Sequence, residues 1–256
     1  FNSYQYYNYE THSVDFDGMM ATLANVPRGD LVLLHGCCHN PSGADLTPSQ
    51  WKSLCKLALK QNFTIFIDLA YQGMGDGIEE DVLGVRLLAE SLPELIVVSS
   101  CSKNFGLYRE RTGAITLICE SDKATSAAST LLAAAARANY SMPPDHGAAI
   151  VELITEDPTL NQMWQEELKR VRDRINELRF IFSESLRKVG VQKDFSFIQS
   201  EKGMFSFLGV NQNQIQELIN KYAIYLVDSS RINVASINKQ NIDYVTNSVA
   251  EVISKG

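Results

Sequence analysis

The residues with the clearest chemical potential lie in one short segment, Ser99 to Arg111, which reads SSCSKNFGLYRER. A lysine in a partly desolvated cleft loses some preference for its charged form, and a neutral amine can attack a carbonyl carbon. The hydroxyls of Ser100 and Ser102 and the guanidinium of Arg111 could hold a phosphate group close to Lys103. An amine that forms a Schiff base beside a phosphate site indicates pyridoxal phosphate (PLP) chemistry.

Other interpretations of this lysine are open. A lysine that follows a strand is more often an ordinary surface residue than a nucleophile. The run from Ser100 to Lys103 also matches the S-x-x-K motif of penicillin-recognising enzymes. The chain contains neither S-D-N nor K-T-G, the motifs that complete that site, so we set this interpretation aside.

The elements around Lys103 follow from the hydrophobic pattern. Leu95 to Val98 is an apolar run that predicts a strand buried on both faces, and similar runs predict strands at residues 31–34, 63–67 and 112–119. Amphipathic patterns predict helices at 14–23, 79–91 and 125–138, and a further helix that Thr47 caps. Strands that alternate with helices indicate an α/β domain with a mainly parallel sheet and flanking helices.

Two more polar residues follow strands of this sheet. Asn40 lies in the turn after residues 31–34, and Asp68 directly follows residues 63–67. Ligands of such sheets bind beyond the carboxyl ends of the strands, so we expect Asn40, Asp68 and Lys103 at one edge. A cationic pyridinium nitrogen would pair with Asp68, although a backbone amide or an arginine would also serve. Asn40 could equally be an ordinary turn residue.

Two histidines flank two cysteines in the run from His35 to His39, which raises the possibility of a metal site. We expect none, because the following glycine and proline make the run a turn without the helical spacing of a zinc pair. The chain offers no further cluster of metal ligands nearby.

A long charged helix at about residues 159–188 predicts a boundary between two domains near Lys169. Residues 1–169 would form the C-terminal part of a large domain, and residues 170–256 a small α+β domain. Strands are expected at 203–208, 224–227 and 231–234, and helices at 212–221 and 239–254. Arg231 starts one of these strands and is either an exposed cation or a carboxylate-binding residue.

The composition limits the class of protein. The 256 residues are 45% hydrophobic, which supports a folded globular chain, and the net charge of −7 without a basic run argues against nucleic acid or membrane binding. The five cysteines follow no disulfide framework, so we expect the cytoplasm or another reducing compartment. No segment has the pattern of a signal peptide or of a membrane span.

Several motifs occur in order along the chain: HGCCHNPSG (35–43), DLAYQG (68–73), SSCSKNFGLYRER (99–111), RANYSMPP (137–144), GMFSF (203–207) and SSRINVA (229–235). With these motifs the chain resembles the aspartate aminotransferases, class I PLP-dependent enzymes of fold type I. The resemblance covers essentially the whole chain, and it implies part of the large PLP-binding domain followed by the small C-terminal domain.

The resemblance implies a role for each candidate residue. Lys103 would form the Schiff base with PLP and move the proton between the substrate Cα and the cofactor's C4′. Asp68 would pair with the pyridine nitrogen, and Asn40 and Tyr71 would donate hydrogen bonds to O3′. Three residues would bind the phosphate group: Ser100, Ser102 and Arg111.

The resemblance also implies the substrates and the assembly. Arg231, together with Asn40, would bind the α-carboxylate of the amino acid. Arg137 would reach the neighbouring subunit's site and bind the side-chain carboxylate of aspartate or glutamate, which implies a homodimer with shared active sites. The implied reaction transfers an amino group from L-aspartate to 2-oxoglutarate and gives oxaloacetate and glutamate.

The chain departs from the family pattern at several points. The family's N-terminal portion, with a phosphate loop and a tryptophan that stacks on PLP, has no counterpart in these residues. Cys101, Ser42 and Met142 replace the usual tyrosine, threonine and asparagine. The missing portion leaves a truncated, non-catalytic fragment as one alternative. An aromatic aminotransferase of the same class is another, because such enzymes share these motifs. A Schiff-base lyase without PLP would leave Asp68 and the phosphate-binding residues without a role.

Overall fold

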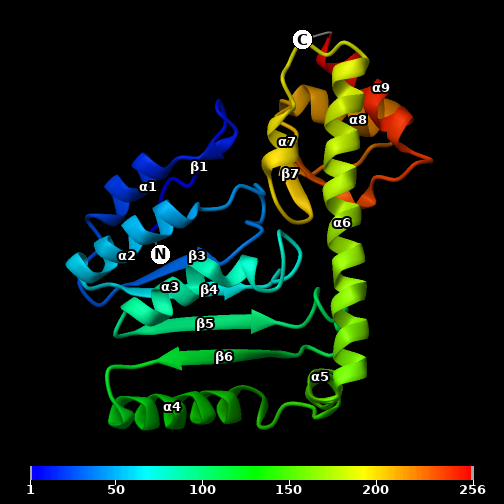
Figure 1. Ribbon diagram of the computed structural model, residues 1–256. Helices are drawn as coiled ribbons and strands as arrows, with labels where there is room; N and C mark the ends of the chain where they lie inside the picture. The colour runs from blue at the N-terminus through cyan, green and yellow to red at the C-terminus, as the bar shows by residue number, and fades with distance from the viewer. Residues whose placement is uncertain (1, 255–256) are drawn as a thin grey trace. The chain divides into compact units, whose positions relative to one another are not determined.

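The computed structural model describes residues 2–254, which form two compact units. The first unit comprises residues 2–5, 16–37 and 46–169, and the second comprises residues 6–15, 38–45 and 170–254. The second unit therefore includes two short segments from the N-terminal part of the chain. Figure 1 labels the elements of both units, which are described separately below.

The first unit contains a four-stranded sheet in the order β3-β4-β5-β6. β3 (Leu31–His35), β4 (Thr64–Leu69) and β5 (Leu95–Ser100) are parallel, and β6 (Gly113–Ile118) pairs with β5 in the antiparallel direction. Figure 1 shows β6 between β5 and helix α4 (Asp122–Tyr140). The predicted α/β fold with a mainly parallel sheet is confirmed.

The other helices of the first unit are α1 (Phe16–Leu23), α2 (Pro48–Gln61), α3 (Leu83–Ser91) and α5 (His146–Glu156), with a 3₁₀ turn η1 (Glu80–Val82) before α3. The predicted start of α2 is confirmed, since Thr47 and Gln50 form a reciprocal capping box. α2 and α3 pack closely at Gly84, where an added Cβ would lie only 2.5 Å from the Trp51 ring.

The expectation that the strands are buried on both faces is wrong for β3 and for β6, whose first four residues are exposed. Val32 and Leu34 are buried, whereas Leu31 and Leu33 are 61% and 53% exposed. Successive side chains of a strand point to opposite faces, so this alternation means that the described residues cover only one face of β3. The buried residues of the sheet form the core of this unit with side chains from the helices, among them Leu54, Ile65, Ile67, Leu88 and Leu95.

Helix α6 (Pro158–Lys188) is one continuous helix of 31 residues that belongs to both units. Its residues up to Lys169 are part of the first unit, and those from Arg170 onward are part of the second. In the second unit its apolar face contributes Leu178, Phe182 and Leu186 to the core.

The second unit pairs β7 (Phe205–Phe207) with β8 (Arg231–Asn233) and β1 (Tyr7–Asn8) with β2 (Ser13–Val14), both antiparallel. Its other elements are α7 (Phe197–Ser200), α8 (Gln212–Tyr222), the 3₁₀ turn η2 (Val234–Ser236) and α9 (Ile242–Ile253). The core includes side chains from α8, η2 and α9, namely Ile215, Leu218, Val234, Ile242, Val249 and Val252.

The strand predicted at residues 224–227 is absent, and this prediction was wrong. Ala223 ends α8 in the left-handed region, with φ of 50°, and the Ile224 N–H donates to the Leu218 carbonyl. These contacts are typical of a helix C-terminus. Tyr225 is 80% exposed, so the apolar residues that suggested a strand are partly solvated.

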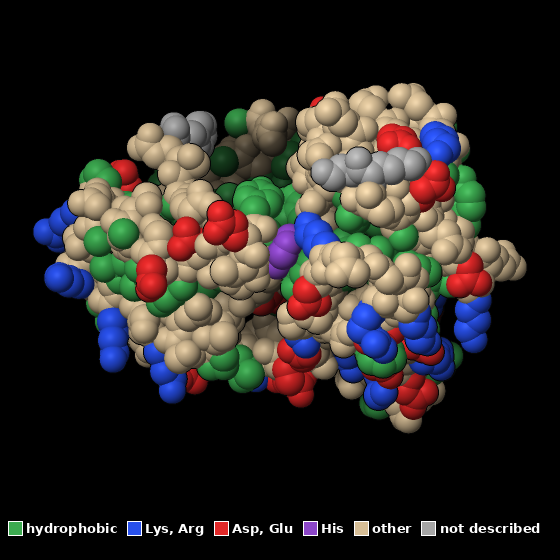
Figure 2. Space-filling view, turned by 90° about the horizontal axis from the view of Figure 1, so that it is seen from above, with side chains coloured by type: hydrophobic (Ala, Val, Ile, Leu, Met, Phe, Trp, Pro, Cys, Tyr) green, Lys and Arg blue, Asp and Glu red, His purple; other side chains and the backbone are tan. Residues whose placement is uncertain are grey.

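The distribution of charge on the surface can be compared with the sequence, which has no basic run. On the face drawn in Figure 2, acidic and basic side chains of the described residues are interspersed. Within residues 2–254, none of the helices combines the length and the apolar character that crossing a membrane requires.

Candidate active site

Lys103 and Tyr71 lie together at the carboxyl ends of neighbouring strands. Tyr71 follows β4, Lys103 follows β5, and the Lys103 Nζ lies 4.5 Å from the centroid of the Tyr71 ring. Tyr71 is only 7% exposed, so the lysine amine faces a fixed aromatic ring. The structure therefore brings Lys103, which the sequence placed at this edge of the sheet, together with Tyr71, which only the family resemblance named.

The first part of α6 holds the loop that carries Lys103. The Trp164 indole N–H donates to the Asn104 carbonyl at 2.8 Å, and the Trp164 ring stacks on Phe105 at a centroid distance of 4.4 Å. An amine that must reach a reacting carbon benefits from a fixed backbone. Trp164 was not among the predicted site residues, and its spacing in a long amphipathic helix gave no signal of this contact.

The predicted phosphate-binding residues share the hairpin between β5 and β6. Ser100 pairs with Gly113, and the Cys101 N–H donates to the Thr112 carbonyl at 3.0 Å. Arg111, with φ of 54°, lies in the turn before β6, and its Nη1 donates to the Tyr108 carbonyl at 3.0 Å. The Ser100 Oγ accepts the Ser102 N–H at 3.1 Å, which fixes the turn that leads to Lys103.

Asp68 lies beside His35 in the parallel pair of β3 and β4. Burial lowers the pKa of His35, and the negative charge of Asp68 acts in the opposite direction. The Gly36 N–H also donates to the Asp68 carbonyl at 2.8 Å. The sequence pattern suggested His35 only as a metal ligand, but the register makes it a neighbour of the predicted pyridine-binding carboxylate.

Asp81 is a buried acidic residue that the sequence analysis missed. Its Oδ2 accepts the N–H groups of Gly73 and Gly75 at 2.8 and 2.9 Å. Its Oδ1 accepts those of Asp76 and Gly77 at 2.8 and 3.4 Å. The carboxylate thus organises the glycine-rich loop that directly follows Tyr71, and the run YQGMGDG followed by an acidic residue was the available signal.

In the second unit the structure brings Asn40 and Arg231 together. The Arg231 Nη1 donates to the Asn40 Oδ1 at 3.0 Å, and the Arg231 Cζ lies 4.6 Å from the centroid of the Phe205 ring. Arg231 begins β8, as predicted, and is opposite Phe207 in β7. A guanidinium held by an amide and an aromatic face has a fixed orientation, which suits the bidentate binding of a carboxylate.

The loop that carries Asn40 is tied down by side chains of its own. The Asp45 carboxylate accepts the N–H groups of Cys38 and His39 at 2.7 and 2.8 Å. The His39 ring bonds to the Ser42 Oγ at 2.8 Å and stacks on Tyr6 at 3.9 Å. The Asn40–Pro41 peptide bond is cis. These contacts give His39 and Ser42 a structural role in this turn.

Arg137 is exposed in the last turn of α4. Within residues 2–254, no hydrogen bond or ion pair joins it to another predicted site residue of this chain. Its proposed partner is a substrate in a neighbouring subunit, so the position of Arg137 within one chain leaves that prediction as it stands.

Comparisons with known proteins identify the family. The family model for aminotransferases of class I and II matches residues 1–249. The aspartate aminotransferase of Haemophilus influenzae is 44% identical over 250 residues, which is 98% of this chain and 63% of that protein. The aromatic-amino-acid aminotransferase of Paracoccus denitrificans is 43% identical, over 98% of this chain and 64% of that protein.

A solved structure agrees with these relatives. The aromatic-amino-acid aminotransferase of Burkholderia pseudomallei, covalently bound to pyridoxal phosphate, has a TM-score of 0.96 at 41% identity, over 98% of this chain and 63% of that one. The chain thus spans less than two thirds of the length of these relatives. The matches cover nearly all of the chain, and they confirm the resemblance that its motifs suggested: the chain belongs to the family of class I and II aminotransferases.

Proposed function

We propose that the protein transfers an amino group between L-aspartate and 2-oxoglutarate with PLP as its cofactor, giving oxaloacetate and glutamate. The observation that carries this proposal is the Lys103 amine, 4.5 Å from the buried Tyr71 ring at the carboxyl ends of β4 and β5. Family membership supports the same reaction, and one solved relative is covalently bound to pyridoxal phosphate.

The chemistry of the available groups suits PLP. The first unit offers an amine, a phenol and a carboxylate at the ends of adjacent strands, and two hydroxyls and a guanidinium in one hairpin. Lys103 would hold the cofactor's aldehyde carbon, Asp68 the pyridine nitrogen, and Tyr71 and Asn40 the O3′ oxygen. Ser100, Ser102 and Arg111 would bind the phosphate group. Bound PLP supplies the electron sink that makes the substrate Cα–H acidic.

The protein's own residues would then direct the proton. With its amine free, Lys103 would take the proton from the substrate Cα and deliver it to the cofactor's C4′. The Tyr71 ring beside this amine limits the positions that Nζ can take, which favours transfer along one path.

Substrate binding is assigned to the arginines. Arg231, oriented by Asn40, would bind the α-carboxylate, and the Asn40–Arg231 hydrogen bond of 3.0 Å supports that assignment. Arg137 of a neighbouring subunit would bind the second carboxylate of aspartate or glutamate. This role requires a homodimer, which we propose as the working assembly.

Aromatic amino acids are the second candidate substrates. The relatives carry aspartate and aromatic aminotransferase names at almost equal identity, 44% and 43%. An arginine that binds a second carboxylate does not exclude an aromatic side chain. Comparing kcat/KM for aspartate and phenylalanine on the natural protein decides between them, and a higher value for phenylalanine would replace aspartate in the proposal.

The compartment is also part of the proposal. Cys55, Cys101 and Cys119 carry free thiols in this structure. Thiols persist where the surroundings are reducing, so we place the protein in the cytoplasm or another reducing compartment.

Lys103→Ala tests the proposed reaction. Removing the amine should abolish turnover while the far-ultraviolet circular dichroism stays unchanged, since the side chain is not part of the core. Full activity in this folded variant would overturn the proposal. A non-catalytic protein is the remaining alternative, and it predicts no turnover in the unmutated protein either.

A further inference from the structure

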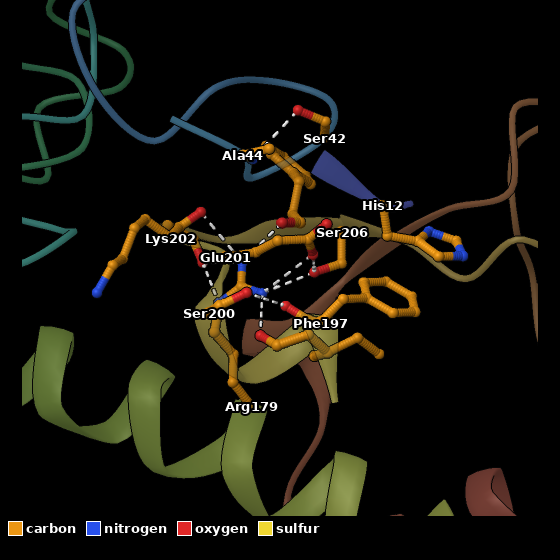
Figure 3. Close-up of polar contacts among 12 residues, drawn as sticks. His12, Ser42, Ala44, Arg179, Phe197, Ser200, Glu201, Lys202 and Ser206 are labelled. Atoms are coloured by element: carbon orange, nitrogen blue, oxygen red, sulfur yellow. Dashed lines mark hydrogen bonds and ion pairs between the residues drawn. The ribbon is translucent and has the colours of Figure 1, made fainter. Parts of the chain in front are cut away.

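Arg179 of α6 is a fully buried arginine, with 1% of its surface exposed. It donates to four backbone carbonyls, those of Ile198, Lys202, Gly203 and Phe205, at distances between 2.6 and 3.2 Å. It also donates to the Ser206 Oγ at 2.6 Å. Figure 3 shows Arg179 beside Lys202, Glu201 and Ser206. A buried guanidinium is tolerated only when its N–H groups are satisfied, so this set of acceptors fixes the segment 198–206 around it.

Glu201 completes the buried cluster. Its carboxylate is 2% exposed, lies 3.6 Å from the Arg179 Nη1, and accepts hydrogen bonds from the hydroxyls of Ser206 and Tyr7. The Ser206 hydroxyl therefore accepts from Arg179 and donates to Glu201. The cluster joins α6, β1 and β7 through one connected set of polar contacts.

The segment around Arg179 is in direct backbone contact with the loop that carries Asn40. The Lys202 N–H donates to the Gly43 carbonyl at 2.7 Å. A Cβ added at Gly43 would lie 2.5 Å from the Phe205 carbonyl oxygen, and φ of Gly43 is +75°. A Cβ added at Gly203 would lie 2.5 Å from the Cys38 Cβ. Both glycines are needed for this close approach, so a shift of residues 198–206 would move the loop as well.

The two groups that hold Arg231 lie on these two segments. Phe205, whose ring lies beneath the Arg231 guanidinium, presents its carbonyl to Arg179 at 2.6 Å. Asn40, whose Oδ1 accepts from Arg231, lies on the loop 38–45 that residues 201–205 contact. Arg179 itself does not contact the Asn40–Arg231 pair in the contacts recorded for residues 2–254, so any effect must pass through the backbone.

We propose that Arg179 is a positioning residue for carboxylate binding: it holds residues 198–206 so that Phe205 and the Asn40 loop orient the Arg231 guanidinium. This inference rests on the proposed role of Arg231 in binding the substrate α-carboxylate. Arg179 then acts on the affinity for substrate more than on the chemical step at Lys103, because it contacts no residue assigned to the proton transfer.

The test is a titration of the PLP-loaded natural protein with succinate, a dicarboxylate without an amino group, followed by steady-state kinetics with aspartate. Arg179→Lys keeps the charge but cannot reach all of the acceptors. We expect the Kd for succinate and the KM for aspartate to rise about tenfold, while kcat changes by less than about threefold. Arg187→Lys, at an exposed arginine of the same helix, is the matched control and should leave all three values unchanged.

Two further variants keep the test decisive. If Arg179→Lys does not fold, Ser206→Ala removes one acceptor of the cluster and should raise the Kd for succinate about threefold without loss of structure. Arg231→Lys separates the two claims. Unchanged succinate binding in Arg231→Lys would overturn the proposed function. Weakened binding in Arg231→Lys, with unchanged binding in folded Arg179→Lys and Ser206→Ala, would overturn only the positioning role of Arg179.

Discussion

The Arg231 Nη1 donates to the Asn40 Oδ1 at 3.0 Å, although the two residues are 191 positions apart in the sequence. The contact joins the turn after β3 to the first residue of β8 within the second unit. It fixes the direction of the Arg231 guanidinium, one face of which lies over the Phe205 ring. The consequences for substrate binding can be tested one residue at a time.

Asn40→Ala should raise the KM for aspartate by about tenfold to a hundredfold, because a hydrogen bond to a charged group contributes about 1.5–3 kcal/mol. Asn40→Asp is the sharper variant. It keeps an acceptor for Arg231 but adds a negative charge beside the site of a bound carboxylate, so it should weaken aspartate binding further. Steady-state kinetics give both values, with Asn25→Ala on the exposed surface as the control. An Asn40→Asp variant with unchanged KM would show that the pair is only structural.

Arg137→Leu should lower kcat/KM for aspartate by about a hundredfold, the effect of losing one charge-assisted pair to the side-chain carboxylate. The value for phenylalanine should change by less than about fivefold, because that substrate has no second carboxylate. Lys123→Leu, at the start of the same helix, serves as the control. Equal losses for both amino acids would contradict the role given to Arg137.

Asp81→Asn should destabilise the first unit by about 2 kcal/mol, because the amide loses one of the oxygens that accept N–H groups from residues 73–77. The lower stability appears as a smaller midpoint in urea unfolding. The loop directly follows Tyr71, which lies beside Lys103, so kcat should fall in the same variant. Asp30→Asn changes an exposed aspartate and should alter neither quantity. A normal midpoint in Asp81→Asn would remove Asp81 from the supports of the site.

Glu201 should make stability fall as the pH rises through neutrality. Burial raises the pKa of Glu201 to about 7, against the opposing effects of the Ser206 hydrogen bond, the Arg179 charge and the Tyr7 hydroxyl, while Asp45 raises it further. A folded-state pKa above the unfolded value gives stability that is fully present below about pH 4.5 and is lost as the pH passes about 7. The free energy of unfolding should therefore decrease by up to about 3 kcal/mol from pH 5 to pH 8 through this group.

Glu201→Gln isolates that contribution, because glutamine stays neutral across the range. The urea midpoint of this variant should depend less on pH between 5 and 8 than that of the unmutated protein. Glu152→Gln, at an exposed glutamate of α5, should leave the pH dependence unchanged. Identical slopes for Glu201→Gln and the unmutated protein would contradict the raised pKa.

The sequence was a good guide where the signals were local. The capping box at Thr47 and Gln50 begins α2 as predicted, and the apolar run at Leu95 ends in the polar turn that carries Lys103. These features depend on residues that are close in sequence. Hydrophobic periodicity and turn chemistry therefore suffice to place them.

The sequence was a poor guide where contacts join distant segments. Arg179 looks like one more charged residue of a long helix, and only the fold shows that it binds carbonyls from residues 198–205. The segments 6–15 and 38–45 belong to the second unit through contacts with residues far along the chain. At Ile224 the apolar run matched a strand pattern, but the left-handed residue before it made the run a helix terminus instead.

A spectroscopic titration shows whether Lys103 holds PLP and exchanges amino groups. The natural protein is loaded with PLP, and its absorbance is recorded before and after aspartate is added. We expect a visible band from the cofactor bound to Lys103, which aspartate converts to the near-ultraviolet band of the amine form. Lys103→Ala should show neither the visible band nor its conversion. A folded protein that binds no PLP, or a Lys103→Ala variant with the same spectra, would contradict this expectation.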